Sequence, residues 1–88
     1  MQKLSLLICC LSVLFISKAQ DTVKTYWKNN QVMSQGIQKA GVEEGIWTYY
    51  HYNGAKWSEG EFKDGQRVGI WKSWYDDGKI NQEYNAVT

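Results

Sequence analysis

Two hydropathy patterns divide the chain. Residues 4–16, LSLLICCLSVLFI, form an unbroken run of apolar and small side chains, whereas apolar and polar positions alternate in short stretches from about residue 20 onward. These stretches are rich in aromatic and β-branched residues, which favour pleated strands, and none keeps a helical period for long. We therefore predict strands near 23–28, 31–38, 45–52, 55–62, 69–75 and 79–84.

The glycines reveal an internal repeat of 24 residues. All eight fall into pairs at that spacing: Gly36 with Gly60, Gly41 with Gly65, Gly45 with Gly69, and Gly54 with Gly78. The stretches GIWTYYHYNG (45–54) and GIWKSWYDDG (69–78) also share their aromatic positions. This periodicity indicates stacked copies at about 21–44, 45–68 and 69–88, of which the first is degenerate.

The turn dipeptides predict how the strands pair. Asn53-Gly54 and Asp77-Gly78 favour two-residue hairpin loops, and Asp64-Gly65 marks the turn between copies. Such loops place Tyr52 opposite Ala55, Tyr50 opposite Trp57, Thr48 opposite Glu59, Trp47 opposite Gly60, Asp76 opposite Lys79, Lys72 opposite Glu83, and Trp71 opposite Tyr84. The predicted fold is all-β, a single-layer antiparallel β-meander of repeated hairpins. Gly54 and Gly78 are expected to tolerate alanine less well than Gly36, which lies inside a strand.

The same register divides the side chains between two faces. One face is nearly free of charge, apart from Lys56, and is expected to be buried; it carries Val23, Trp27, Val32, Trp47, Tyr49, Phe62, Trp71, Tyr75, Ile80 and Tyr84. The other face is charged and carries four further aromatic residues, our candidate ligand-binding residues: Tyr26, Tyr50, Trp57 and Trp74. Tyr26, Tyr50 and Trp74 are 24 residues apart and form a ladder. Such a ladder suits stacking on sugar rings or gripping an extended peptide, or it simply stiffens the sheet.

The apolar run near the N-terminus predicts export. A basic start at Lys3, the run itself, and small side chains at Ser17 and Ala19 are typical of a signal peptide, here residues 1–19, cleaved before Gln20. Thirteen helical residues span about 20 Å, too short for the roughly 30 Å core of a bilayer, so a signal peptide is favoured over an anchor. The mature repeat domain, 20–88, is then periplasmic, on the cell surface or secreted, and does not span the membrane.

Charge and reactive side chains argue against several functions. Without Lys3 and Lys18 the chain has eight basic and nine acidic residues and no basic patch, so nucleic acid is not an expected partner. Both cysteines, Cys9 and Cys10, lie in the apolar run, and His51 is the only histidine, so no metal site or catalytic triad is expected. Glu59 and Glu61 have a glycosidase-like spacing through strand geometry alone. We expect no catalytic residues and no cofactor.

One stretch carries a family resemblance. EGEFKDGQRVG (59–69) resembles the core of a MORN repeat, with an aromatic, Glu-Gly, an aromatic, Asp-Gly, a basic residue and Gly, and the longer period resembles the bacterial MORN variant. The resemblance covers 45–84 well and 21–44 weakly. It implies a β-meander, no catalytic residues and a binding or scaffolding role, and some variant arrays are grouped with antitoxins.

Two functions follow as expectations. The first is an exported, non-enzymatic binding module for a protein or a glycan. The alternative is an antitoxin-like or immunity protein that neutralises a toxin by direct binding. Because a short array leaves its end strands unpaired, self-association through those strands is also expected.

Overall fold

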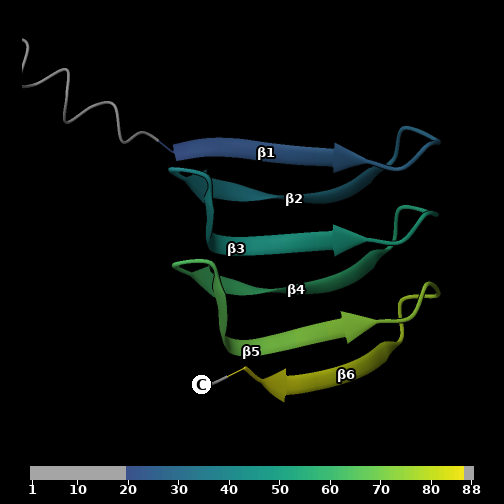
Figure 1. The fold of residues 1–88 in the computed structure, drawn as a ribbon. Coiled ribbons are helices and arrows are strands. Elements are labelled where there is room, and N and C mark those ends of the chain that lie inside the picture. The colour runs from purple at the N-terminus through teal and green to yellow at the C-terminus, as the bar shows by residue number, and fades with distance from the viewer. Residues whose placement is uncertain (1–19, 87–88) are drawn as a thin grey trace, which may run out of the picture.

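The chain folds into one antiparallel sheet. The computed structural model describes residues 20–86. Its six strands are β1 (Gln20–Tyr26), β2 (Val32–Lys39), β3 (Val42–Tyr50), β4 (Lys56–Lys63), β5 (Gln66–Trp74) and β6 (Ile80–Asn85). Each strand pairs with the next in sequence, as Figure 1 shows, so the predicted β-meander is confirmed. Every strand end lies within three residues of its predicted position.

One prediction falls on residues that the structure does not describe: the predicted signal peptide, residues 1–19, lies outside the described part of the chain. Within residues 20–86, no helix has the length and apolar character needed to cross a membrane.

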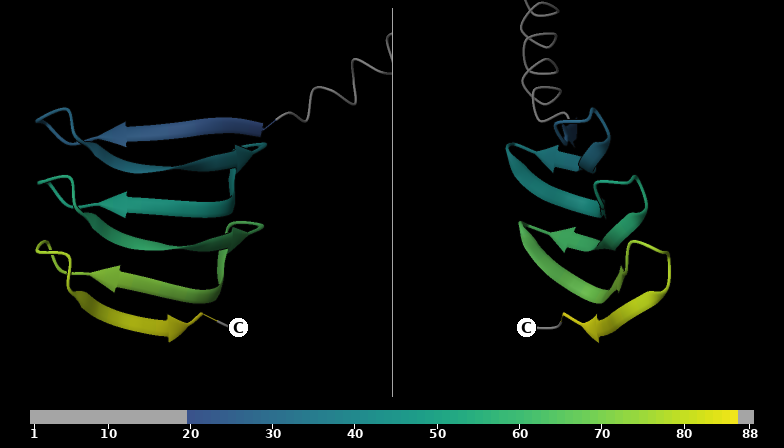
Figure 2. Two further views of the ribbon diagram at one scale, coloured as in Figure 1. Left: turned by 180° about the vertical axis from the view of Figure 1, so that it is seen from behind. Right: turned by 90° about the vertical axis from the view of Figure 1, so that its right-hand side faces the viewer.

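The sheet is one layer thick, and its core is small. Seen from the side in Figure 2, the hairpins follow one another, and no second layer covers either face of the described residues. Trp47, Phe62 and Trp71 are the buried apolar side chains of this part of the chain. Phe62 lies between the two indoles and meets each edge-to-face, with centroid distances of 6.1 Å to Trp47 and 5.3 Å to Trp71. We call the side that carries these three rings the tryptophan face, and the other side the opposite face.

Each buried tryptophan lies over a glycine of the preceding strand. The indole of Trp47 covers Gly36, and that of Trp71 covers Gly60. Each indole N–H also donates to a carbonyl on that strand, Trp47 to Ile37 (3.0 Å) and Trp71 to Glu61 (3.2 Å). The predicted register of Trp47 with Gly60 is confirmed. The ring, however, leans the other way, toward the preceding copy.

The loops at Asn53-Gly54 and Asp77-Gly78 differ from the prediction. They contain three residues instead of two, because the N–H of His51 bonds the Ala55 carbonyl (2.8 Å) and the N–H of Tyr75 bonds the Lys79 carbonyl (2.8 Å). The pairings of Tyr52 with Ala55 and of Asp76 with Lys79 were therefore wrong. The N–H of Gly54 bonds the His51 carbonyl, and the N–H of Gly78 bonds the Tyr75 carbonyl. Both glycines have positive φ, which completes the geometry of a three-residue hairpin loop.

A bulge beside each three-residue loop restores the register. In β4 the extra residue is Trp57, so that Tyr50 pairs with Lys56, while Tyr49 pairs with Ser58 and Thr48 with Glu59. The prediction that Tyr50 faces Trp57 was wrong, whereas the inner pair of Thr48 with Glu59 is confirmed. The pairs of Lys72 with Glu83 and of Trp71 with Tyr84 are likewise confirmed.

The bulges move several side chains to the face not predicted for them. Val32 pairs with Tyr26, Lys56 with Tyr50, and Ile80 with Trp74. Directly opposed residues share a face, so Val32, Lys56 and Ile80 lie on the opposite face and not on the tryptophan face. Ile80 and Tyr75, both predicted to be buried, are 59% and 53% exposed.

Candidate functional site

The predicted aromatic ladder is present on the opposite face. Tyr26, Tyr50 and Trp74 are the residues that pair with Val32, Lys56 and Ile80, the same position in three successive hairpins. Tyr26, at the first hairpin, is 54% exposed, whereas Tyr50 and Trp74 are half-buried. The structure thus brings together three of the four predicted site residues.

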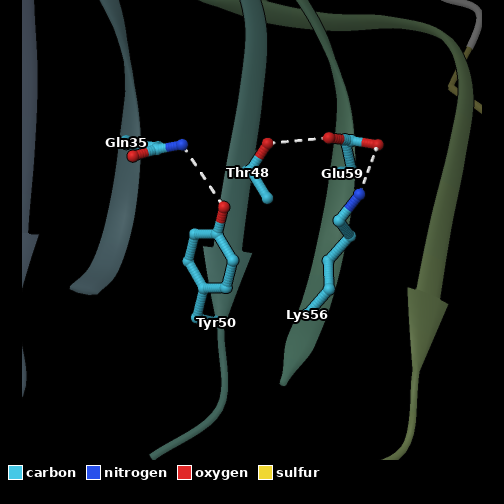
Figure 3. A network of polar contacts seen from close by, with 5 residues as sticks. All are labelled: Gln35, Thr48, Tyr50, Lys56 and Glu59. Atoms are coloured by element: carbon cyan, nitrogen blue, oxygen red, sulfur yellow. Dashed lines mark hydrogen bonds and ion pairs between the residues drawn. The ribbon is translucent and has the colours of Figure 1, made fainter. Parts of the chain in front are cut away.

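Polar side chains contact two of the ladder rings. The Gln35 amide donates to the Tyr50 hydroxyl (3.3 Å), and the Lys56 ammonium lies 5.4 Å from the centroid of the Trp74 ring. Lys56 also bonds the Glu59 carboxylate (3.2 Å), which accepts from the Thr48 hydroxyl (2.8 Å), as Figure 3 shows. Tyr50 and Trp74 are therefore already engaged with neighbouring side chains of the protein.

Trp57, the fourth predicted residue, lies away from the ladder. It is the bulge residue of β4 and lines a groove of about 380 Å³ on the tryptophan face, together with Tyr49, Ser58, Arg67, Ser73, Gln82 and Tyr84. Its indole is 46% exposed and lies 5.7 Å from the His51 ring. The bulge is the physical cause, because the extra residue interrupts the strict alternation on which the predicted face depended.

Arg67 supplies the positive charge of this groove. Its guanidinium lies 4.5 Å from the centroid of the buried Trp71 ring, and it donates to the Tyr84 hydroxyl (2.9 Å). Arg67 pairs with Phe62 across β4 and β5, which places it on the tryptophan face. In residues 20–86 the ion pair present joins Lys56 and Glu59, so no carboxylate of this part of the chain forms an ion pair with Arg67.

Tyr49 forms the wall of the groove above the core. Its ring lies 6.4 Å from both Trp47 and Trp71. Burial raises the pKa of the Tyr49 hydroxyl, the nearby charge of Arg67 lowers it, and Glu43 raises it further, with a net rise. The hydroxyl is therefore protonated at neutral pH and can donate a hydrogen bond into the groove.

The groove was not predicted from the sequence, although part of the signal was present. Arg67 lies an even number of residues before Trp71, so strand alternation alone puts both on one face. Tyr49 and Tyr84 were assigned to the tryptophan face, but as buried residues. A cation placed by strand alternation on the same face as the buried tryptophans was the feature that could have indicated a site.

The groove offers recognition groups and lacks metal ligands. Its walls contain aromatic rings, hydroxyls, an amide and one guanidinium. Across the described residues, no cluster of three or more His, Cys, Asp or Glu side chains is arranged to hold a metal ion. The arrangement can stack a flat ligand, accept and donate hydrogen bonds, and bind an anionic group.

Comparison with known proteins identifies the repeat. Residues 43–64 and 67–86 match the family model of the MORN repeat variant, a non-catalytic repeat type generally associated with binding and interaction. Among curated proteins and among solved structures, nothing matches the chain significantly. The matched segments contain the hairpins β3–β4 and β5–β6, and the β1–β2 hairpin repeats their geometry ahead of them. Residues 43–64 and 67–86 are therefore two consecutive repeats of the MORN variant type.

Proposed function

We propose that this protein is an exported, non-enzymatic binding module that recognises a protein or a glycan. The observation that carries the proposal is the exposure of large apolar side chains on a one-layer sheet. Nine of them in the described residues are at least 36% exposed, among them Trp57 and Tyr84 in the groove. Exposed aromatic residues on a rigid scaffold are typical of binding surfaces.

The groove is the favoured binding surface of the two candidates. Trp57 and Tyr84 present exposed ring surface around a hollow of about 380 Å³. On the opposite face, Tyr50 and Trp74 are in contact with Gln35 and Lys56. A ligand that stacked on those two rings would first have to displace these contacts, whereas the groove needs no such rearrangement.

The family and the sequence support the remaining parts of the proposal. MORN repeats are non-catalytic and are associated with interaction, which favours a binding module over an enzyme. The predicted signal peptide favours export. An antitoxin-like role stays an alternative expectation, and a tight one-to-one complex with a toxic protein would identify it.

A capture experiment tests the proposal. Purified protein is immobilised and exposed to envelope and culture-medium fractions, and retained proteins and glycans are identified by mass spectrometry. We expect saturable binding that Trp57→Ala abolishes and that the Tyr50→Ala/Trp74→Ala variant retains, with circular dichroism confirming that both variants fold. Binding lost only in the double variant would move the site to the ladder. Absence of any saturable ligand would contradict the proposed function.

A further inference from the structure

We propose that the groove on the tryptophan face binds an acidic carbohydrate, with a sugar ring stacked on Trp57 and its carboxylate held by Arg67. The inference rests on the proposed binding function and names the chemical class of the ligand. It combines three features of the groove: exposed aromatic surface, a guanidinium that forms no ion pair within residues 20–86, and hydroxyl and amide groups in the lining.

The aromatic surface suits the weakly polar face of a sugar. The face of an aromatic ring carries partial negative charge, which attracts the C–H groups that line one side of a pyranose. Trp57 is 46% exposed and lines the groove, with Tyr49 and Tyr84 as further walls. A volume of about 380 Å³ lies within the usual range for small-ligand sites and admits one or two sugar rings.

The guanidinium selects a carboxylate. One face of Arg67 lies against Trp71, and one of its N–H groups bonds the Tyr84 hydroxyl, so both contacts fix its orientation. A guanidinium has five N–H donors in a planar fork, which matches the two oxygens of a carboxylate. Because no acidic side chain in residues 20–86 forms an ion pair with Arg67, a ligand carboxylate can take the place of that partner.

The polar residues match the remaining chemistry of a sugar. Ser58, Ser73 and Gln82 line the groove between the aromatic walls. Hydroxyls both donate and accept, and an amide carries both kinds of group, so each can bond a sugar hydroxyl in either sense. Ser73 and Gln82 are directly paired across β5 and β6, which holds both on the same face.

The position of the groove argues against an extended peptide. Peptides that join a sheet pair their backbone with the free edge of a strand. The groove lies over β3 to β6, and β3, β4 and β5 are each paired on both sides. Only side chains therefore face a ligand over most of the groove, which suits a sugar better than a strand-like peptide.

Calorimetric titration with trigalacturonate, and with its fully methyl-esterified form as the uncharged match, tests this inference. We expect the acid to bind at least tenfold more tightly than the ester, because the ester removes the charge that Arg67 recognises. Arg67→Gln should make acid and ester equally weak, and Arg67→Lys should recover part of the preference. Trp57→Ala should abolish binding of both. The control is Ile70→Ala, which removes an exposed apolar side chain on the opposite face. This variant should bind trigalacturonate as the unmodified protein does.

Three results would overturn the inference. The first is an ester that binds as well as the acid, and the second is an Arg67→Gln variant that keeps the acid preference. The third is a triglutamate peptide that binds as tightly as trigalacturonate, which would assign the groove to acidic peptides. If a Trp57-dependent partner is captured but trigalacturonate does not bind, the proposed function stands and only the ligand class is wrong.

Discussion

At the scale of single residues, the close approach of tryptophan to glycine organises the sheet. Trp47 and Trp71 reach their buried positions because Gly36 and Gly60 have no side chain. The pairing of β2 with β3 is interrupted by a bulge at Gly45, and that of β4 with β5 by a bulge at Gly69; both glycines have positive φ. These bulges let β3 and β5 bring their tryptophans over the preceding strand. Two glycines and one tryptophan thus form one packing unit at each of the two junctions between copies.

A first prediction follows for alanine at these glycines. We expect Gly36→Ala and Gly60→Ala to lower the free energy of unfolding by about 2–3 kcal/mol each, because a Cβ would overlap the indole above it. Gly78→Ala is the matched comparison. It has positive φ but open space around it, so its cost is about 1 kcal/mol. Urea denaturation measures the order.

This order reverses the expectation drawn from the sequence, in which the turn glycines matter most. The sequence reveals that Gly36 and Gly60 are equivalent, but not that an indole lies on each. If Gly78→Ala proved more destabilising than Gly60→Ala, the packing of Trp71 over Gly60 would be contradicted.

At the scale of elements, the two ends of the hairpins use different loops. Three-residue loops join the strands within each copy, whereas two-residue loops at Ala40-Gly41 and Asp64-Gly65 join successive copies. Both residues of each two-residue loop have positive φ, 53° and 81° in the first and 52° and 81° in the second. The two-residue turn geometry predicted for Asn53-Gly54 is therefore found at the other end of the sheet.

The second prediction concerns Ala40. Alanine at positive φ is strained, whereas Asn and Asp are the usual residues before Gly in this turn. Ala40→Asn should therefore stabilise the protein by about 0.5–1 kcal/mol, seen as a higher Tm. Asp64→Ala, the reverse change at the equivalent position of the next copy, should destabilise it. A lower Tm for Ala40→Asn would contradict the φ of this loop.

The elements also show how far sequence reasoning reaches. The six strands, their order and the inner register followed from glycine spacing and alternation, because those patterns act along the whole strand. The three-residue loop shifts the pairing of β3 with β4 by one residue, and the bulge at Trp57 shifts it back. Thr48 therefore still pairs with Glu59, while Trp57 lies on the other face. No local pattern distinguishes this pair of compensating changes from a two-residue loop, and the candidate site was misplaced for that reason.

At the scale of the whole molecule, side chains in the three-residue loops link each copy to the next. The Asn29 amide donates to the Tyr52 carbonyl and the Asn53 amide to the Asp76 carbonyl, both at 2.9 Å. The carbonyl oxygens of both amides accept the N–H two residues on within their own loops. Figure 1 shows these loops following one another along one side of the sheet. Each asparagine therefore closes its own loop and bonds the next one.

The last copy keeps only half of this arrangement, and the final prediction depends on it. Asp77 occupies the position of Asn53, and its carboxylate accepts the Lys79 N–H (2.9 Å) as an asparagine would, but it has no N–H to donate. Asn53→Asp should keep its own loop, lose the bond to Asp76, and place a carboxylate oxygen against that carbonyl, at a cost of about 1 kcal/mol. Asp77→Asn, the matched control, gains an N–H donor for which residues 20–86 offer no following loop, so its effect should stay within about 0.5 kcal/mol. Both changes are measured by urea denaturation at neutral pH. Equal effects of the two substitutions would mean that the Asn53 bond between copies contributes nothing measurable to the free energy of unfolding.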